Sequence, residues 1–402
     1  MGIKLVIVES PAKARKIGGF LGDDYVVEAS VGHIRDLPQR AADIPKEYKK
    51  IAWAKEGVNI EEDFAPLYVI NPDKKTKVSE LKALMKDADE LILATDEDRE
   101  GEAIAWHLIE VLRPKIPIRR MVFHEITKEA IQKAASETRD LDYRLVDAQE
   151  TRRVLDRLFG YRLSPVLWKK VMPRISAGRV QSVATRLIVE RERERMAFIS
   201  SGWWDLTAQC ADGFSARLLS LDGKRVAATN DFDTNGGLKE KSAANILLLN
   251  EVTANELVQN LKNSELTVKS TEESPRTERP KAPFTTSTMQ QDAGSRLGWG
   301  AQLTMRVAQR LYENGYITYM RTDSVSLSPS SIESARNFAK SLYGAEYIPD
   351  TPRTYLGKSK NAQEAHEAIR PAGETFRTPG ELAPELSRDE FALYDLIWKR
   401  TI

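Results

Sequence analysis

The chain has 402 residues, of which 41% are hydrophobic and 30% are charged, a composition typical of a soluble protein of about two to four domains. No apolar run reaches membrane-spanning length, and no charged-then-apolar leader opens the chain. The single cysteine, Cys210, excludes an internal disulfide and a cysteine-based zinc site. These features predict a cytoplasmic protein without a membrane partner, and the net charge of +1 by itself indicates nothing about nucleic acid.

The first predicted element is a buried strand, Ile3–Val8, which is followed by the acid Glu9. Ser10 is a good N-cap and Pro11 suits a first helical turn, so a helix begins here. Lys13 then lies in that first turn, where a cation opposes the helix dipole and a bound anion would remove the conflict. The alternative, in which Lys13 extends into water, stays equally open.

A second strand, Glu90–Thr95, runs into a seven-residue segment, Asp96–Glu102, that contains five acids. Ordinary charges at a helix N-terminus explain one or two of them. Acids at alternate positions, Asp96, Asp98 and Glu100, suit a hard cation with oxygen ligands, and Mg²⁺ fits better than softer metals.

An EF-hand loop is the competing motif for this acidic segment, because Gly101 falls at its sixth position. The motif fails elsewhere, since its twelfth position is His107 and a strand precedes the loop where a helix should be. A helix is instead predicted over Ala103–Val111.

Met121–Ile126 is predicted as a third strand, and a helix follows from Thr127 to about Ser136. Three successive strand–helix units predict a doubly wound, mostly parallel sheet over roughly the first 140 residues. Because parallel sheets place their sites at the carboxyl ends of strands, Glu9 is expected to meet the acids that follow the second strand.

The next patterns are helical, over Tyr143–Gly160 and over Ala177–Ile199. Between Thr151 and Arg179 there are eight Lys or Arg and one acid, Asp156. Such a stretch can follow a phosphate backbone or form a solvated helix face, and both interpretations remain open. Further elements are predicted in chain order: strands within Trp203–Thr229, a helix over Thr253–Lys262, a strand over Leu266–Ser270, a hinge over Pro275–Pro283, and helices over Thr285–Leu297 and Leu303–Asn314.

Gly315–Ser324 is predicted as a short strand that ends in a polar turn. Alternate residues of a strand share a face, which would place Tyr319 beside Arg321. An adjacent guanidinium can lower the pKa of a phenol and grip a phosphate, as a nucleophilic tyrosine requires. The alternative is a half-buried strand with one exposed arginine.

The remaining chain is predicted to form a helix over Ser330–Tyr343 and a final amphipathic helix over Ser387–Ile402, whose apolar residues suggest packing against a continuation of the chain. Between them, His366 and Arg370 are explained in isolation by one core histidine and one surface arginine. The chain contains no phosphate-binding loop of the G-x-x-x-x-G-K-[ST] type, so ATP-driven chemistry is not indicated.

Six motifs together resemble the type IA DNA topoisomerases, and specifically the bacterial topoisomerase I group with its Toprim domain. The motifs are Val8–Lys13, Thr95–Glu102, Arg152–Arg157, Ser176–Ser182, Tyr319–Ser324 and His366–Pro371. The resemblance implies a multidomain α/β and α protein: a Toprim domain over residues 1–141, a first part of a helical DNA-binding domain over 142–199, a first part of an arch over 200–268, an active-site tyrosine domain over 269–386, and the start of a second arch pass over 387–402.

The resemblance also implies a mechanism, in which Tyr319 cleaves one DNA strand, becomes joined to the 5′ phosphate, and is released when the 3′ hydroxyl reverses the reaction. Negatively supercoiled and single-stranded DNA are the expected partners, with no ATP, a monomeric enzyme and a location at the bacterial nucleoid. Catalytic roles fall to five residues: Tyr319, Arg321, Glu9, Lys13 and His366. Mg²⁺, needed chiefly for rejoining, would be held by Glu9, Asp96, Asp98 and Glu100.

DNA contacts are implied for ten positions: Arg99, Arg152, Arg153, Asp156, Tyr161, Arg179, Gln181, Ser182, Thr322 and Arg370. Arg152 and Asp156 would pair near the cleft, and the positions of Arg153 and Tyr161 grip a base upstream of the cut, where the family prefers cytosine. The family's torus would be incomplete in this chain, which predicts a fragment impaired in relaxation. Two rival interpretations are a Toprim primase or nuclease, which forms no covalent adduct, and a non-catalytic single-strand-binding protein.

Overall fold

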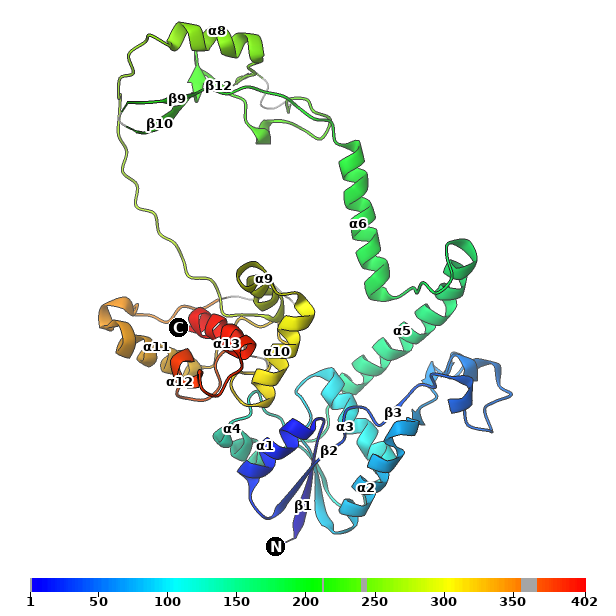
Figure 1. Ribbon diagram of the computed structural model, residues 1–402. Coiled ribbons are helices and arrows are strands. Elements are labelled where there is room, and N and C mark those ends of the chain that lie inside the picture. Colours follow the sequence, from blue (N-terminus) through cyan, green and yellow to red (C-terminus); the bar gives the residue numbers. More distant parts are fainter. Residues whose placement is uncertain (1, 212, 240–243, 356–366) are drawn as a thin grey trace. The chain divides into compact units, whose positions relative to one another are not determined.

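The computed structural model describes residues 2–211, 213–239, 244–355 and 367–402 (Figure 1). The chain divides into two compact units, one formed by Met1–Tyr161 with Arg279–Ile402 and the other by Arg162–Glu278. Within the described ranges, no helix combines the length and apolar character needed to cross a membrane.

The first unit is built on a four-stranded parallel sheet with the strand order β2-β1-β7-β8. The strands are β1 (Ile3–Val8), β2 (Tyr25–Ala29), β7 (Ala88–Leu93) and β8 (Ile118–Arg120). In the register, Leu5 of β1 lies opposite Val26 and Leu91, and Leu91 lies opposite Ile118. Leu5–Val8 are fully buried, as expected for a parallel strand that is covered on both faces.

Helices cover both faces of this sheet, as the doubly wound prediction requires (Figure 1). Leu5 and Ile7 belong to the core shared with α2 (Lys75–Lys86) and α3 (Arg99–Leu112). Val6 and Val8 point the other way, into the core shared with α1 (Pro11–Leu21) and α4 (Lys128–Ser136). The alternation follows directly from the two-residue period of a strand.

The predicted third strand is wrong in position, because β8 covers Ile118–Arg120 and Met121–Ile126 forms no strand. Met121, Phe123 and Ile126 are nevertheless buried in the core on the α1 and α4 face. Their apolar character therefore reports burial and not strand pairing.

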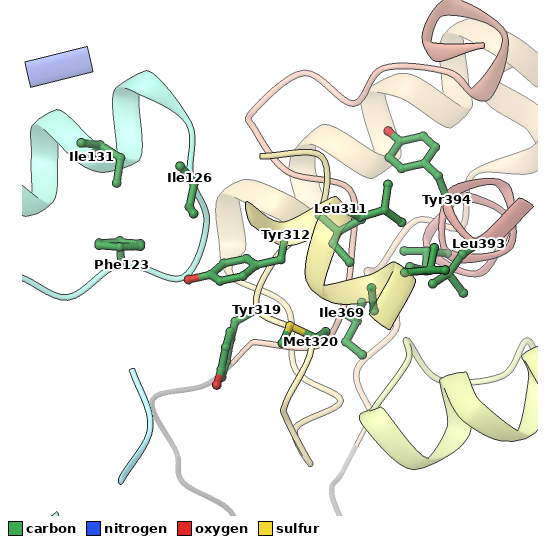
Figure 2. Packing of buried hydrophobic residues seen from close by; sticks show 14 of the residues in the cluster. Phe123, Ile126, Ile131, Leu311, Tyr312, Tyr319, Met320, Ile369, Leu393 and Tyr394 are labelled. Atoms are coloured by element: carbon green, nitrogen blue, oxygen red, sulfur yellow. The ribbon is translucent and has the colours of Figure 1, made fainter. Parts of the chain in front are cut away.

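The same core extends into the second segment of this unit, so that one apolar cluster joins the sheet to the helices after Arg279 (Figure 2). These helices are α9 (Thr286–Leu297), α10 (Ala301–Glu313), α11 (Pro329–Tyr343), α12 (Pro379–Leu382) and α13 (Arg388–Thr401). Figure 2 shows Tyr312 of α10 between Ile126 and Leu311, with Tyr319 below it.

The apolar side chains of the final helix, α13, pack against other helices of the first unit. Leu393, Tyr394 and Ile397 are buried in the common core, and α13 packs against α9, α10 and α12. The burial of these apolar residues is therefore explained by contacts within the described chain, and packing against a continuation is not needed to account for it.

Short pairings complete the first unit: β3 (Arg35–Asp36) with β6 (Val69–Ile70) and β4 (Val58–Asn59) with β5 (Ala65–Pro66). Single 3₁₀ turns of the chain lie at Ala41–Asp43, Ala52–Lys55, Pro72–Lys74, Thr229–Asp231 and Ala345–Tyr347. The long helix α5 (Tyr143–Lys170) continues past Gly160, where the sequence predicted its end, and includes Pro165.

The second unit contains α6 (Arg179–Ala197), α8 (Glu251–Leu261) and two small sheets. The sheets pair β9 (Thr207–Gln209) with β10 (Ser215–Arg217), and β12 (Lys224–Val226) with β11 (Ser220–Leu221) and β13 (Ile246–Leu247). The strand predicted over Leu266–Ser270 does not form, and this exposed segment has no regular structure. The predicted hinge at Pro275–Pro283 is likewise irregular.

Candidate active site

The acidic segment leaves the carboxyl end of β7 and turns into α3. Asp98 is the N-cap of α3, and its Oδ1 accepts a hydrogen bond from the Gly101 amide at 2.7 Å. A Cβ atom at Gly101 would clash with the carbonyl of Asp96, so glycine is required for this close approach of helix and loop. The hydroxyl of Thr95 donates to the Gly101 carbonyl at 2.7 Å and closes the turn.

Arg120, at the end of β8, holds this turn in place through hydrogen bonds. Its buried guanidinium donates to Glu102 at 2.9 Å and to the carbonyl oxygens of Asp96 at 2.8 Å, Leu93 at 3.0 Å and Met121 at 2.6 Å. The sequence analysis did not single out Arg120, because an arginine after a short strand is ordinary until the fold places it under the acidic turn.

Lys13 lies in the first turn of α1 and is fully buried, so the interpretation in which it extends into water is wrong. Its ammonium group forms ion pairs with both Glu9 and Asp96. Burial lowers the pKa of Lys13, but Asp96 and Glu9 outweigh this effect and the pKa rises above its usual range. Two carboxylates thus supply the negative charge that a cation at a helix N-terminus calls for.

Glu9 and Asp96 respond to this cluster in opposite directions. Burial, and next the charge of Asp96, hold the pKa of Glu9 well above its usual range. Burial also acts to raise the pKa of Asp96, but Lys13 and hydrogen bonds from Glu9, Lys13 and Tyr312 lower it. Of the two acids, Glu9 is therefore the one that binds a proton more readily, and its Oε2 is buried without a hydrogen-bond partner among the described residues.

Tyr312 is a site residue that the sequence analysis missed. It lies on the buried face of α10, and its hydroxyl donates to Asp96 at 3.0 Å. Its ring meets the ring of Tyr319 edge to face, with centroids 5.1 Å apart. Helical spacing marks Tyr312 as a core residue, and only the fold shows that its polar end reaches the carboxylates.

Tyr319 does not lie in a strand, since among the described residues Gly315–Ser324 pairs only through an isolated bridge from Ile317 to Pro371. Backbone hydrogen bonds hold the segment on both sides instead. The Tyr319 amide donates to the carbonyl of His124 and the Thr318 amide donates to the carbonyl of Arg370, both at 2.9 Å.

The N-terminus of α9 holds the residues that follow Tyr319. The hydroxyl of Thr286 donates to the Met320 carbonyl at 2.7 Å and accepts from the Thr322 amide at 2.9 Å. The backbone of Tyr319–Thr322 is therefore fixed by tertiary contacts that no local sequence pattern contains.

The Tyr319 side chain, which lies beside Tyr312 in Figure 2, is buried, with 6% of its surface exposed. Its hydroxyl donates to Asp98 Oδ2 at 2.6 Å. Burial raises the pKa of Tyr319, the charges of Asp96 and Asp98 raise it further, and Arg321 lowers it by less. Arg321 therefore acts in the predicted direction, but the expectation of a lowered Tyr319 pKa is wrong for this arrangement.

Arg321 is exposed and borders two adjoining pockets. One, of about 420 Å³, is lined by Glu9, Asp96, Asp98 and Glu100 and by Met305, Arg306 and Gln309 of α10. The other, of about 740 Å³, shares Asp98, Glu100 and Arg321 and adds His33, Arg99, Arg152, Thr286, Ser287, Thr322 and Asp323. The fold thus brings the four predicted metal ligands and Arg321 to one place.

The four carboxylates offer only oxygen donors, the set that suits Mg²⁺, and the unpartnered Oε2 of Glu9 fits an additional cation nearby. Within the described ranges, no three acidic, histidine or cysteine side chains converge closely enough to form a metal centre by themselves. Glu100 is held by Gln149 at 3.2 Å and Arg152 at 3.3 Å, and chiefly a hydrogen bond with His33 lowers its pKa to about 2.

Other predicted site residues occupy varied settings. Arg152 contacts Glu100, and Arg153 is paired with Asp36. Arg370 is buried between Glu125 at 2.9 Å and Glu367 at 2.6 Å. Arg179, Gln181 and Ser182 begin α6 in the other unit, and His366 lies outside the described residues.

Comparisons with known proteins assign both parts of the chain. Residues 4–126 match the Toprim domain, and residues 140–402 match the DNA topoisomerase family. DNA topoisomerase 1 of Mycolicibacterium smegmatis is 59% identical over 409 residues, covering 99% of this chain and 44% of that protein. The enzyme of the same name from Streptomyces coelicolor is 60% identical over 411 residues, covering 100% of this chain and 42% of that protein.

A solved structure extends the likeness to three dimensions. Full-length topoisomerase I from Thermotoga maritima superposes with a TM-score of 0.77 at 37% identity, covering 98% of this chain and 60% of that one. This chain spans less than half the length of the curated relatives named above. The two family matches agree with the parallel sheet, its acidic turn and the buried tyrosine beside that turn. The chain therefore belongs to the type IA DNA topoisomerase family.

Proposed function

We propose that this chain carries the strand-cleaving and strand-rejoining site of a type IA DNA topoisomerase. One observation supports this function above others: the Tyr319 hydroxyl is hydrogen-bonded to Asp98 beside a pocket that four carboxylates and Arg321 line. A tyrosine in this position can attack a phosphodiester of single-stranded DNA.

In the cleavage step the Tyr319 oxygen forms a bond to phosphorus while the bond to the 3′ oxygen breaks. The phenolic proton passes to Asp98, which already accepts its hydrogen bond at 2.6 Å. Arg321 stabilises the charge on the phosphate. Glu9, whose raised pKa makes it the more readily protonated acid beside Asp96, donates a proton to the departing 3′ oxygen, and rejoining reverses each transfer.

The phosphate energy is retained in the phosphotyrosine bond, which agrees with a reaction that consumes no ATP. Lys13 provides a buried positive charge beside Glu9 and Asp96, and it is proposed to contact the scissile phosphate when DNA is bound. His366 is proposed to support the phosphate network.

Asp96, Asp98, Glu100 and Glu9 are the residues that would hold Mg²⁺, as their shared pocket and oxygen donors support. The bound ion would supply positive charge that neutralises the reacting phosphate. This chain's own residues set the positions of the nucleophile, the acid and the guanidinium.

Single-stranded DNA is the proposed ligand of the basic positions named above, with negatively supercoiled DNA as the physiological substrate in the nucleoid of a bacterial cytoplasm. Arg152 and Thr322 line the larger pocket, which supports a strand path from there toward Tyr319. Arg153 and Tyr161 are proposed to grip one upstream base. Binding through phosphates predicts an affinity that falls with salt.

The decisive experiment uses the 402-residue chain as a monomer, with a labelled single-stranded oligonucleotide and Mg²⁺, and quenches the reaction with SDS. We expect a covalent protein–DNA adduct that is lost in Tyr319→Phe. Tyr316→Phe is the matched control. The Tyr316 hydroxyl donates a hydrogen bond of 3.0 Å to Glu385, which is not one of the four predicted metal ligands.

Other outcomes separate the rival functions. Mg²⁺-dependent cleavage without an adduct, unchanged in Tyr319→Phe, would identify a Toprim nuclease. Binding without cleavage would identify a single-strand-binding protein. The five-segment division of the chain and its impaired relaxation of supercoiled plasmid remain predictions, and relaxation by the purified chain would contradict the second.

A further inference from the structure

Tyr312 lies where three segments of the first unit meet. It is fully buried near the C-terminal end of α10. Its hydroxyl donates to Asp96 Oδ1 at 3.0 Å, and the ammonium group of Lys13 lies 4.8 Å from the centre of its ring. Figure 2 shows its ring beside that of Tyr319, the edge-to-face contact with centroids 5.1 Å apart. One side chain therefore contacts a proposed metal ligand, a proposed phosphate contact and the proposed nucleophile.

The polar end of Tyr312 acts on one particular oxygen of Asp96. Lys13 pairs with the same atom, Oδ1, so a neutral hydroxyl and a charged ammonium group meet there. Burial, and next the charge of Asp96, hold the pKa of Tyr312 well above its usual range. The hydroxyl therefore keeps its proton and remains a hydrogen-bond donor to the carboxylate.

The backbone of Tyr312 is fixed as well as its side chain. The Gly315 amide donates to the Tyr312 carbonyl at 2.8 Å, in the turn that joins α10 to the segment of Tyr319. Gly315 has a φ of 73°, and a Cβ atom there would lie 2.3 Å from the carbonyl oxygen of Ile126. Because the turn and the buried ring are both held, the hydroxyl of Tyr312 presents its donor to Asp96 from a fixed position.

We propose that Tyr312 is a positioning residue that orients the Asp96 carboxylate for a divalent cation in the pocket of the four acids. The inference rests on the proposed function, in which Asp96 and three further carboxylates hold Mg²⁺. Tyr312 does not line that pocket, so it acts on the cation only through Asp96.

A neutral donor is suited to this task in a way that Lys13 is not. The ammonium group of Lys13 competes with a metal ion for the negative charge of Asp96, whereas the Tyr312 hydroxyl orients the carboxylate and adds no positive charge. Within the described ranges no three ligand side chains already converge into a metal centre, so the direction in which each carboxylate points decides how well an ion is held. Loss of a hydrogen-bond partner behind a metal ligand typically costs about 10–100-fold in metal affinity.

The test measures Mn²⁺ binding to the full 402-residue chain without DNA, so that it does not depend on cleavage. Mn²⁺ replaces Mg²⁺ because both ions suit sites built from oxygen ligands, and the EPR signal of the free ion gives its concentration. Tyr312→Phe keeps the ring beside Lys13 and Tyr319 and removes only the hydroxyl. We expect it to weaken Mn²⁺ binding by at least about tenfold. Asp96→Asn should weaken the binding at least as much, which identifies the site of the ion.

Tyr394→Phe is the matched control, which separates positioning from folding. Tyr394 is buried in the same apolar cluster, and its hydroxyl donates to the carbonyl of Arg377 at 2.7 Å instead of to a carboxylate. Both variants therefore remove one phenolic hydrogen bond and keep the ring. Tyr394→Phe should leave the Mn²⁺ affinity unchanged, and in the adduct assay Tyr312→Phe alone should raise the Mg²⁺ concentration that gives half-maximal rejoining.

Unchanged or tighter Mn²⁺ binding in Tyr312→Phe would overturn the inference, and so would an equal loss in Tyr394→Phe, full binding in Asp96→Asn or no binding in the parent chain. The adduct assay distinguishes these results from failure of the proposed chemistry. A chain that forms the Tyr319 adduct but binds Mn²⁺ equally well without the Tyr312 hydroxyl refutes the positioning role alone. A chain whose Mn²⁺ affinity depends on that hydroxyl but that forms no adduct refutes the catalytic proposal alone.

Discussion

Replacement of Arg120 by methionine tests whether one buried guanidinium holds the acidic turn in place. The variant has a flexible apolar side chain and lacks the four hydrogen bonds to Glu102 and to the carbonyls of Leu93, Asp96 and Met121. Removing one partner of a buried ion pair costs about 3–5 kcal/mol, because the other partner stays buried.

The structure places the expected cost of Arg120→Met near the lower end of this range. Glu102 keeps a hydrogen bond from Arg139 at 2.9 Å, and the Leu93 carbonyl keeps one from the Met121 amide at 2.9 Å. The carbonyls of Asp96 and Met121 lose the Arg120 donor. We therefore expect the free energy of local opening to fall by about 3 kcal/mol, which is roughly a hundredfold in the opening equilibrium.

Hydrogen exchange of the amides in β7 and α3 is the suitable assay, because it reads local opening in a chain with more than one unit. Arg119→Met, at the residue next to Arg120, is the matched control. The Arg119 side chain is half exposed and its guanidinium lies 3.9 Å from Glu90, so the free energy of local opening should change by no more than about 0.5 kcal/mol. Equal loss of protection in the two variants would refute the role assigned to Arg120.

Two further predictions concern other supports of the site. Burial, and next the charge of Arg35, lower the pKa of His107 to about 2. The neutral His107 therefore contributes its full share of the unfolding free energy above the ordinary pKa of about 6.5, and this contribution falls by about 1.4 kcal/mol for each pH unit below it. Urea unfolding between pH 7 and 5 should show this loss in the wild type and less of it in His107→Gln, and identical slopes would contradict the assignment. Thr286→Val removes the hydroxyl that bonds Met320 and Thr322, so we expect about 1–2 kcal/mol of local destabilisation and a lower adduct yield at unchanged oligonucleotide affinity. Ser295→Ala, on the exposed side of α9, is its control, and equal adduct yields would rule out the role.

Elements with a complete local signal were predictable. Ser10 caps α1 and Thr127 caps α4, as the residue types indicate, since an N-cap needs only a side-chain oxygen and the next turn. The buried strands β1 and β7 were equally clear. The strand predicted at Met121–Ile126 was wrong because apolar residues can be buried by a neighbouring helical layer without pairing to a strand.

The candidate site was predictable in its carboxylates and less so in its supports. Strand ends and parallel topology were enough to bring Glu9 toward Asp96. Tyr312 and Arg120 could not be identified, since their polar ends reach the site only through packing between segments far apart in sequence. The composition of the Tyr319 segment favours a strand, whereas tertiary hydrogen bonds fix its actual path.

The five acids that follow β7 are all paired within the chain, although their number indicated a metal site. Ordinary helix N-terminal charges explain only one or two of these acids, yet in the structure each acid has a partner from the chain itself: Lys13 for Asp96, His124 for Glu97, the Tyr319 hydroxyl for Asp98, Arg152 for Glu100 and Arg120 for Glu102. The number of acids alone therefore does not call for a cation. The proposal of Mg²⁺ depends instead on the pocket that Glu9, Asp96, Asp98 and Glu100 line together, where oxygen donors from two strand ends face the same space as Arg321.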